Sequence, residues 1–283
     1  MDFLITQIEQ YFKPLELQKI ATKLDKTFRL NYFWNGWNEL EKLLFSKTNI
    51  DLQYIKECYH YRDVYNMIIM RYGKTERIVK YYLSKDFINN EDEVCMYEMN
   101  IGNSRLDFAR INGNSYAYEI KTELDNTNRL IEQISAYEQV FEYVNVVIHE
   151  KHLEKVDKLL SKKVGIILYH FKDNNLTFAH IRKAKENKKI KKSSQLQILN
   201  SNDLKFIIKD IIRDNNVPDY KDDRFRIVNK YFDKNELNDA FKKAIKERQS
   251  KKWKHIKDNF NVLNPIELQD AYTYEFDIKQ LID

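Results

Sequence analysis

The stretch SRLDFARINGNSYAYEIK, residues 104–121, decides the fold. Apolar side chains alternate in it with charged or small ones on both sides of the sequence NGN at 112–114. Because Asn and Gly tolerate a positive φ, NGN predicts the tight turn of a β-hairpin. If the turn is centred on its glycine, Asp107 lies directly opposite Glu119 on the neighbouring strand.

The two strands of this hairpin have faces of different chemistry, because successive side chains of a strand point to opposite sides. One face is apolar and should pack on the core; it carries Leu106, Phe108, Tyr116, Tyr118 and Ile120. The other combines charged with small side chains, namely Arg105, Asp107, Ala109, Ser115, Ala117, Glu119 and Lys121. We expect this second face to form the floor of a cleft, with Arg105 opposite Lys121.

Two carboxylates opposed across strands repel each other, and a cation between them removes the repulsion. Mg²⁺ is the natural candidate because it takes hard oxygen ligands, often one or two carboxylates plus a substrate phosphate. Lys121 follows Glu119 by two residues and points to the same side. An ammonium there can stabilise a pentavalent phosphate or orient the attacking water. Asp107, Glu119 and Lys121 therefore predict phosphodiester hydrolysis.

Outward from the hairpin, the hydrophobic periodicity predicts an α/β protein. Residues 1–85 have the apolar spacing of helices, and a short strand VCMYEMN precedes the hairpin. A helix at about 127–141 follows, and then the strands VNVVIHE, VGIILYHF and LTFAHI with a helix near 152–162. The polar run 182–194 reads as a boundary or an exposed extension before further helices. We predict a helical region at 1–70, a core at 71–185 and a basic helical region at 186–283.

Three motifs follow one another in this core. They are R-x-D at Arg105 and Asp107, E-I-K at Glu119, Ile120 and Lys121, and R-L-x-x-Q-x-x-x-Y at Arg129, Leu130, Gln133 and Tyr137. The pattern resembles the PD-(D/E)XK nuclease superfamily of restriction endonucleases and Holliday-junction resolvases, and is most similar to a group of small bacterial members. The resemblance covers about residues 75–185. The proline that names the motif is missing, and Leu106 precedes the aspartate instead.

The resemblance implies a restriction-endonuclease-like core, in which a mixed central sheet is flanked by helices. It implies a DNA nuclease that uses Mg²⁺, with Mn²⁺ as a substitute, held by Asp107 and Glu119 while Lys121 aids catalysis. By position, Gln133 joins the catalytic group, Glu98 is an additional metal ligand, and Glu76 is an auxiliary glutamate on the preceding helix. Arg105, Arg129 and Tyr137 are expected to contact nucleic acid.

Plainer interpretations stand beside these. E-x-K is common in a Lys/Glu-rich chain and can be a solvated strand edge with a cross-strand ion pair. The line Arg129, Gln133 and Tyr137 can be the edge of an amphipathic helix, and Glu76 can simply favour the helix dipole. The basic stretches 182–192 and 242–254 suit phosphate contact, the second with Trp253 for base stacking, or are charged surfaces.

Composition sets broad limits on function. The formal net charge is +5 and the pI is near 8.8, which is compatible with nucleic-acid binding without demanding it. Cys58 and Cys95 have neither metal-site spacing nor the number a disulfide framework needs. No signal peptide or membrane span is expected, so we predict a cytoplasmic protein, and a homodimer is left open.

Three rival functions remain at this point. The same fold could be a catalytically weak or inactive interaction module for nucleic acid or protein, in a mobile-element or phage-defence system. It could act on RNA or a nucleotide instead of DNA. It could also be a structural helical protein with no metal site. The choice between endonuclease and exonuclease, and the pathway, are likewise open.

Overall fold

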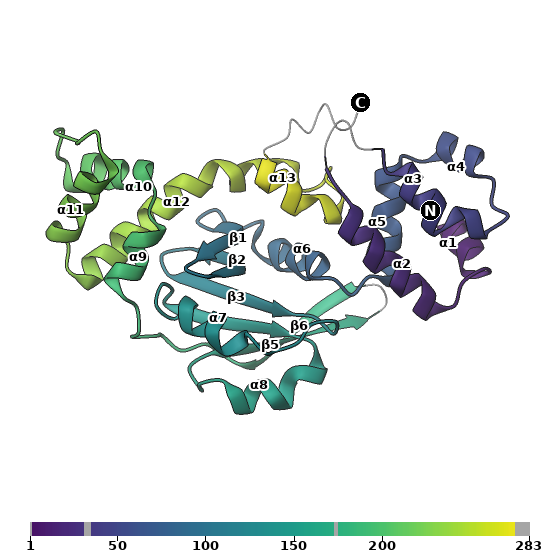
Figure 1. Cartoon of the computed structure of the whole chain (residues 1–283), viewed down its shortest axis with the longest axis horizontal. Helices are drawn as coiled ribbons and strands as arrows, with labels where there is room; N and C mark the ends of the chain where they lie inside the picture. The colour runs from purple at the N-terminus through teal and green to yellow at the C-terminus, as the bar shows by residue number, and fades with distance from the viewer. Residues whose placement is uncertain (1, 31–34, 173–174, 275–283) are drawn as a thin grey trace. The chain divides into compact units, whose positions relative to one another are not determined.

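A computed structural model describes residues 2–30, 35–172 and 175–274 (Figure 1). The chain divides into two units. Unit 1 contains Met1–Lys85, Phe171–Thr177 and His255–Asp283, and unit 2 contains Asp86–His170 and Phe178–Lys254. The three sequence regions predicted above stay a prediction, and the last nine residues of the third lie outside the described residues.

Unit 1 is built mainly from helices, as the periodicity of residues 1–85 predicts. They are α1 (Asp2–Glu9), α2 (Pro14–Thr27), α3 (Trp37–Leu43), η1 (Phe45–Lys47), α4 (Leu52–Cys58), α5 (Tyr61–Tyr72), most of α6 (Glu76–Phe87), η4 (Pro265–Glu267) and α13 (Leu268–Tyr274). The Arg62 guanidinium joins α5 to the fully buried Glu267 carboxylate through two hydrogen bonds of 2.5 and 2.9 Å. A two-pronged pair of this kind fixes the geometry of both elements.

The six strands form one mixed sheet, in which they lie in chain order (Figure 1). The strands are β1 (Val94–Ile101), β2 (Ser104–Ile111), β3 (Ser115–Lys121), β4 (Tyr143–Ile148), β5 (Gly165–Lys172) and β6 (Asn175–Arg182). The pairs β1/β2 and β2/β3 are antiparallel, whereas β3/β4 and β4/β5 are parallel. Parallel neighbours need crossovers, which α7 (Leu130–Tyr137) supplies before β4, and η2 (Glu150–His152) with α8 (Leu153–Leu159) before β5. The predicted α/β class is confirmed.

The hairpin register agrees with the prediction. Phe108 pairs with Tyr118 and Ile111 with Ser115, as required for a turn centred on Gly113. Gly113 has a φ of 103°, a conformation that glycine adopts without strain. The sequence NGN therefore sets which strand residues face each other.

Part of the polar face of the hairpin, expected to form the floor of a cleft, is covered. Ala109, Ala117 and Glu119 are each fully buried. The cover is α7, whose buried Tyr137 reaches Glu119 directly. The small side chains make room for a packed helix, while Arg105 on the same face is exposed and Asp107 and Lys121 are partly buried.

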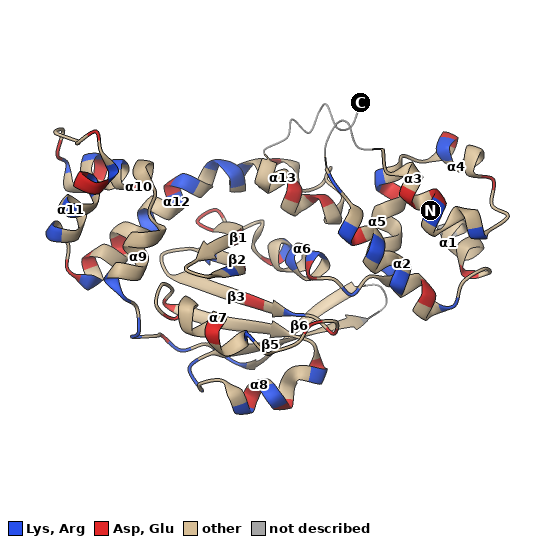
Figure 2. Ribbon diagram, viewed as in Figure 1, with Lys and Arg blue, Asp and Glu red and all other residues tan. Residues whose placement is uncertain are grey.

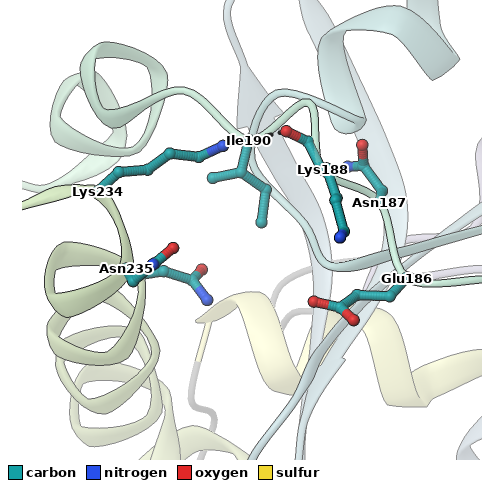
Figure 3. A pocket seen from close by; sticks show the side chains of 7 residues that line it. Glu186, Asn187, Lys188, Ile190, Lys234 and Asn235 are labelled. Atoms are coloured by element: carbon teal, nitrogen blue, oxygen red, sulfur yellow. Dashed lines mark hydrogen bonds between the residues drawn. The ribbon is translucent and has the colours of Figure 1, made fainter.

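The loop after β6, predicted as a boundary or an exposed extension, has mostly exposed side chains but is anchored to the core. The Asn187 side chain is buried and its amide donates to the carbonyls of Glu138 and Phe141 at 2.5 and 2.8 Å. Lys234 Nζ donates to the Lys188 carbonyl at 3.0 Å beside a polar cavity of about 370 Å³ (Figure 3). The loop is thus held to the core by side-chain hydrogen bonds to backbone carbonyls, which its composition does not reveal.

The remaining helices of unit 2 are α9 (Lys192–Ile198), α10 (Ser201–Phe206), the π-helix η3 (Ile207–Ile212), α11 (Lys221–Tyr231) and most of α12 (Lys234–Asn259). Asn200 caps α10, since its side chain accepts hydrogen bonds from the amides of Asn202 and Asp203.

Trp253 is only 1% exposed, so base stacking on this ring, one interpretation of the basic stretch 242–254, is wrong. None of the described helices has the length and apolarity that a bilayer crossing requires.

Candidate active site

The candidate site lies in unit 2, where Glu119 of β3 is its most buried acid. This side chain has no exposed surface, and each of its carboxylate oxygens has a donor. Lys121 Nζ lies 2.5 Å from Oε1, and the Tyr137 hydroxyl donates to Oε2 at 2.8 Å. A buried carboxylate needs such partners because desolvation of an unpaired charge costs several kcal/mol per ion, to an order of magnitude. The prediction that Glu119 and Lys121 share one face is confirmed.

Tyr137 supports Glu119 from α7 and does not extend outward to nucleic acid. Its side chain is fully buried, and its hydroxyl also lies 3.0 Å from the Arg105 carbonyl oxygen. Burial raises the pKa of Tyr137 well above its ordinary value, and the nearby carboxylates of Glu119 and Asp107 raise it further. The phenol therefore keeps its proton and stays a hydrogen-bond donor. Its expected role as a nucleic-acid contact is corrected to that of a positioning residue.

Asp107 of β2 is half-buried and is fixed by the neighbouring strand. Its Oδ2 accepts a hydrogen bond of 2.6 Å from the Ile120 amide. A carboxylate oxygen of Asp107 and one of Glu98 lie within 4.8 Å of each other. At that separation two carboxylates repel unless a positive charge lies close by. Glu98, predicted as an additional ligand, is thus next to Asp107.

The backbone of Glu98 is strained. Its φ is 55°, a left-handed conformation that a non-glycine residue rarely adopts inside a strand. The regular pairing of β1 with β2 includes Tyr97 and Met99 but omits Glu98 between them. Strained residues are concentrated at functional sites, where the strain aims a side chain. Here the Glu98 carboxylate forms an ion pair of 2.5 Å with Arg105 Nε.

The other predicted residues differ in how deeply they are buried. Arg129 is exposed and immediately precedes α7, Gln133 is half-buried, and Tyr137 at the end of the same line is fully buried. Gln133 hydrogen-bonds the Tyr137 hydroxyl, while its buried Oε1 has no partner among the described residues. Glu76 begins α6 in unit 1, where it forms an ion pair with the buried Lys80. Its membership of the site stays a prediction.

The side-chain oxygens gathered here are suitable ligands for a hard divalent cation. Glu98 and Asp107 supply two carboxylates close together, and Gln133 adds a buried amide oxygen that no described residue hydrogen-bonds. Mg²⁺ prefers such oxygen ligands and keeps several waters. The ligand types present therefore match those that Mg²⁺ prefers, and all three residues belong to unit 2.

Tyr137→Phe should destabilise the protein by about 1–3 kcal/mol, because it removes the hydroxyl that donates a hydrogen bond to the buried Glu119 Oε2. Urea unfolding followed by circular dichroism measures the change. Tyr143→Phe is the matched control, since that hydroxyl has no hydrogen bond within the described part of the chain, and it should shift stability by less than about 0.5 kcal/mol. Equal stability of the two variants would contradict a supporting role for Tyr137.

Comparison with known proteins shows the family to which this chain belongs. A family model described as bacteriophage P4 protein cII matches residues 73–270 of the 283. This chain belongs to the bacteriophage P4 protein cII family. The matched range includes every candidate site residue named above, from Glu76 to Tyr137.

A curated member of the cII family, protein cII of Enterobacteria phage P4, is 29% identical over 119 residues. The alignment covers 41% of this chain and 45% of the phage protein, so it spans less than half of either. A solved structure of a protein of unknown function from Silicibacter pomeroyi aligns with 49% of this cII-family chain and 94% of its own, at 13% identity and a TM-score of 0.31. That likeness carries no argument about function.

Proposed function

We propose that this cII-family protein is a metal-dependent nuclease with a restriction-endonuclease-like core that hydrolyses phosphodiester bonds in DNA. The observation that carries the proposal is the joining of Asp107, Glu119 and Lys121 by one hairpin and the helix that packs on it. The Ile120 amide donates a hydrogen bond to Asp107, and the Tyr137 hydroxyl donates one to Glu119. The mixed sheet with helical crossovers supports the same core.

In this proposal Asp107, Glu119 and Glu98 would hold Mg²⁺, with Mn²⁺ as a substitute. The ion would stabilise charge on the phosphate and lower the pKa of a bound water. Lys121 stands beside Glu119 and brings a positive charge to the oxygen that becomes negative in the transition state. Gln133 and Arg129, on the line that leads to the surface, would position the phosphate. Tyr137 fixes the direction of Glu119.

Lysines of α12 that line a groove beside the hairpin turn support a polynucleotide substrate. Lys242 and Arg248 of α12 are paired with the carboxylates of Glu142 and Asp203. Lys243 is exposed on the same helix and, with Lys246, lines a groove of about 270 Å³ beside Gly113. Figure 2 shows Lys and Arg recurring along α12. Cations clustered along a groove attract phosphate backbones with little regard to sequence.

The proposal predicts cleavage of DNA by the purified chain in the presence of Mg²⁺ or Mn²⁺ and none with excess chelator. Supercoiled plasmid reports internal cuts, and end-labelled linear duplex reports removal of terminal nucleotides. A labelled RNA of the same sequence tests the choice of nucleic acid. Failure to cut any of these substrates with either metal would overturn the nuclease proposal.

One observation favours an inactive interaction module on the same core. Glu119 is fully buried, and both of its oxygens are engaged by Lys121 and Tyr137. Such an arrangement also suits a purely structural ion pair. DNA binding that is unchanged by divalent metal, without cleavage, would identify this alternative.

A further inference from the structure

A further cavity lies on the opposite face of the sheet from Glu119. It has a volume of about 340 Å³ and belongs to unit 2. Tyr116, Tyr118, Tyr143, Asn145, His180 and Lys183 are among its lining residues, and we refer to it as the tyrosine cavity. Tyr118 and Glu119 are successive on β3 and so point to opposite faces. The tyrosine cavity is therefore separate from the candidate active site.

A rigid stack of planar groups forms one side of the tyrosine cavity. Arg110, Tyr116 and Tyr143 are register neighbours on β2, β3 and β4. The Arg110 guanidinium lies 3.8 Å from the Tyr116 ring centre, and the Tyr116 and Tyr143 rings stack at 4.9 Å and 18°. The buried Glu93 holds Arg110 with hydrogen bonds of 2.9 and 3.0 Å. Tyr143 ends the stack and is half-exposed, so a planar ligand can extend it.

A polar group lies beside this ring. Asn145 is only 6% exposed, yet its side-chain amide has no hydrogen bond to any residue that the structure describes. Gly165 pairs with Asn145 across β4 and β5. A Cβ at Gly165 would lie 2.2 Å from Asn145 Oδ1, so the glycine is what leaves room for the amide. An amide that lines a cavity and makes no hydrogen bond to the described residues offers both a donor and an acceptor to a ligand.

The rim of the tyrosine cavity carries a lysine and a histidine. His180 and Lys183 are both exposed there. An aromatic platform, an amide that can read a base edge and a cation for phosphate are the groups that recognise a single nucleotide. We propose that the tyrosine cavity binds a nucleotide, with the base against Tyr143 and Asn145 and the phosphate near Lys183. The nucleotide can be free or an unpaired member of a strand.

Calorimetric titration of the full chain with mononucleotides and with short single-stranded DNA separates these two sources. The Asp107→Asn chain is used for the strand, so that no cleavage accompanies binding. Binding of both probes indicates recognition of the nucleotide itself, and binding of the strand alone indicates an unpaired nucleotide within a polymer. Binding of neither probe would overturn the proposal, whatever the outcome of the cleavage assays.

Variants place the ligand in the tyrosine cavity. Tyr143→Ala should weaken binding by about ten-fold or more through loss of the stack, whereas Tyr143→Phe keeps the ring and should bind as the parent does. Lys183→Ala should weaken nucleotide binding by a few-fold. The matched control Lys185→Ala changes an exposed lysine outside the cavity lining and should leave binding unchanged. Circular dichroism verifies that each variant is folded. Unchanged affinity in folded Tyr143→Ala, or equal loss in both lysine variants, would place the ligand elsewhere.

Discussion

Asp107→Asn is expected to lower metal-dependent DNA cleavage by about 100-fold or more while the protein stays folded. Even residues that only support a metal ligand typically change activity or affinity by roughly 10–100-fold. Asparagine keeps an oxygen that can accept the 2.6 Å hydrogen bond from the Ile120 amide, so β2 and β3 retain their link. The substitution removes charge and little else. Initial cleavage rates at saturating Mg²⁺ measure the effect.

The same variant should be at least as stable as the parent in the absence of metal. The Glu98 carboxylate lies within 4.8 Å of that of Asp107, and removing one of two like charges relieves their repulsion. Asp210→Asn, which alters an exposed carboxylate of η3, is the matched control and should cleave normally. Full activity in Asp107→Asn would remove Asp107 from the active site and with it the proposed metal centre.

Local sequence was sufficient for the part of the site that depends on strand register. The NGN turn places Phe108 opposite Tyr118, and alternation then places Glu119 and Lys121 on one face, as observed. The helix after β3 was also predicted, although at about 127–141, whereas it runs from Leu130 to Tyr137. These features follow from turn chemistry and periodicity, which act within a few residues.

Features that depend on packing between distant segments were not predictable in this way. The four-residue spacing from Gln133 to Tyr137 puts both on one side of α7, but only the packing of α7 on β3 buries the Tyr137 ring and turns its hydroxyl to Glu119. The left-handed backbone of Glu98 has no signal in its sequence, because glutamate ordinarily avoids that conformation. The anchoring of Asn187 likewise depends on carbonyls some forty to fifty residues earlier. The shared face of Glu119 and Lys121 could be found from the sequence, whereas the approach of Glu98 to Asp107 and the supports of these side chains required the structure.

Lys121→Met is expected to destabilise the protein by about 3–5 kcal/mol, the range for removing one partner of a buried ion pair. Methionine retains most of the apolar stem of lysine, so the loss reports the missing charge and not a cavity. Glu119 would remain fully buried with the Tyr137 hydroxyl as a partner but without the ammonium 2.5 Å from Oε1. Urea unfolding gives the change in free energy. Lys155→Met, an exposed lysine on α8, should be within about 0.5 kcal/mol of the parent.

The double variant Lys121→Met/Glu119→Gln separates folding from chemistry. Glutamine accepts the Tyr137 hydrogen bond without a charge, so the double variant should recover most of the stability that Lys121→Met loses. If the pair serves only to hold β3 against α7, a stable double variant should keep whatever activity the parent has. If Lys121 and Glu119 take part in hydrolysis, it should be folded and inactive. Glu119 and Lys121 are the charged residues of β3. Cleavage at the parent rate by this folded protein would therefore show that their ion pair has a structural role alone.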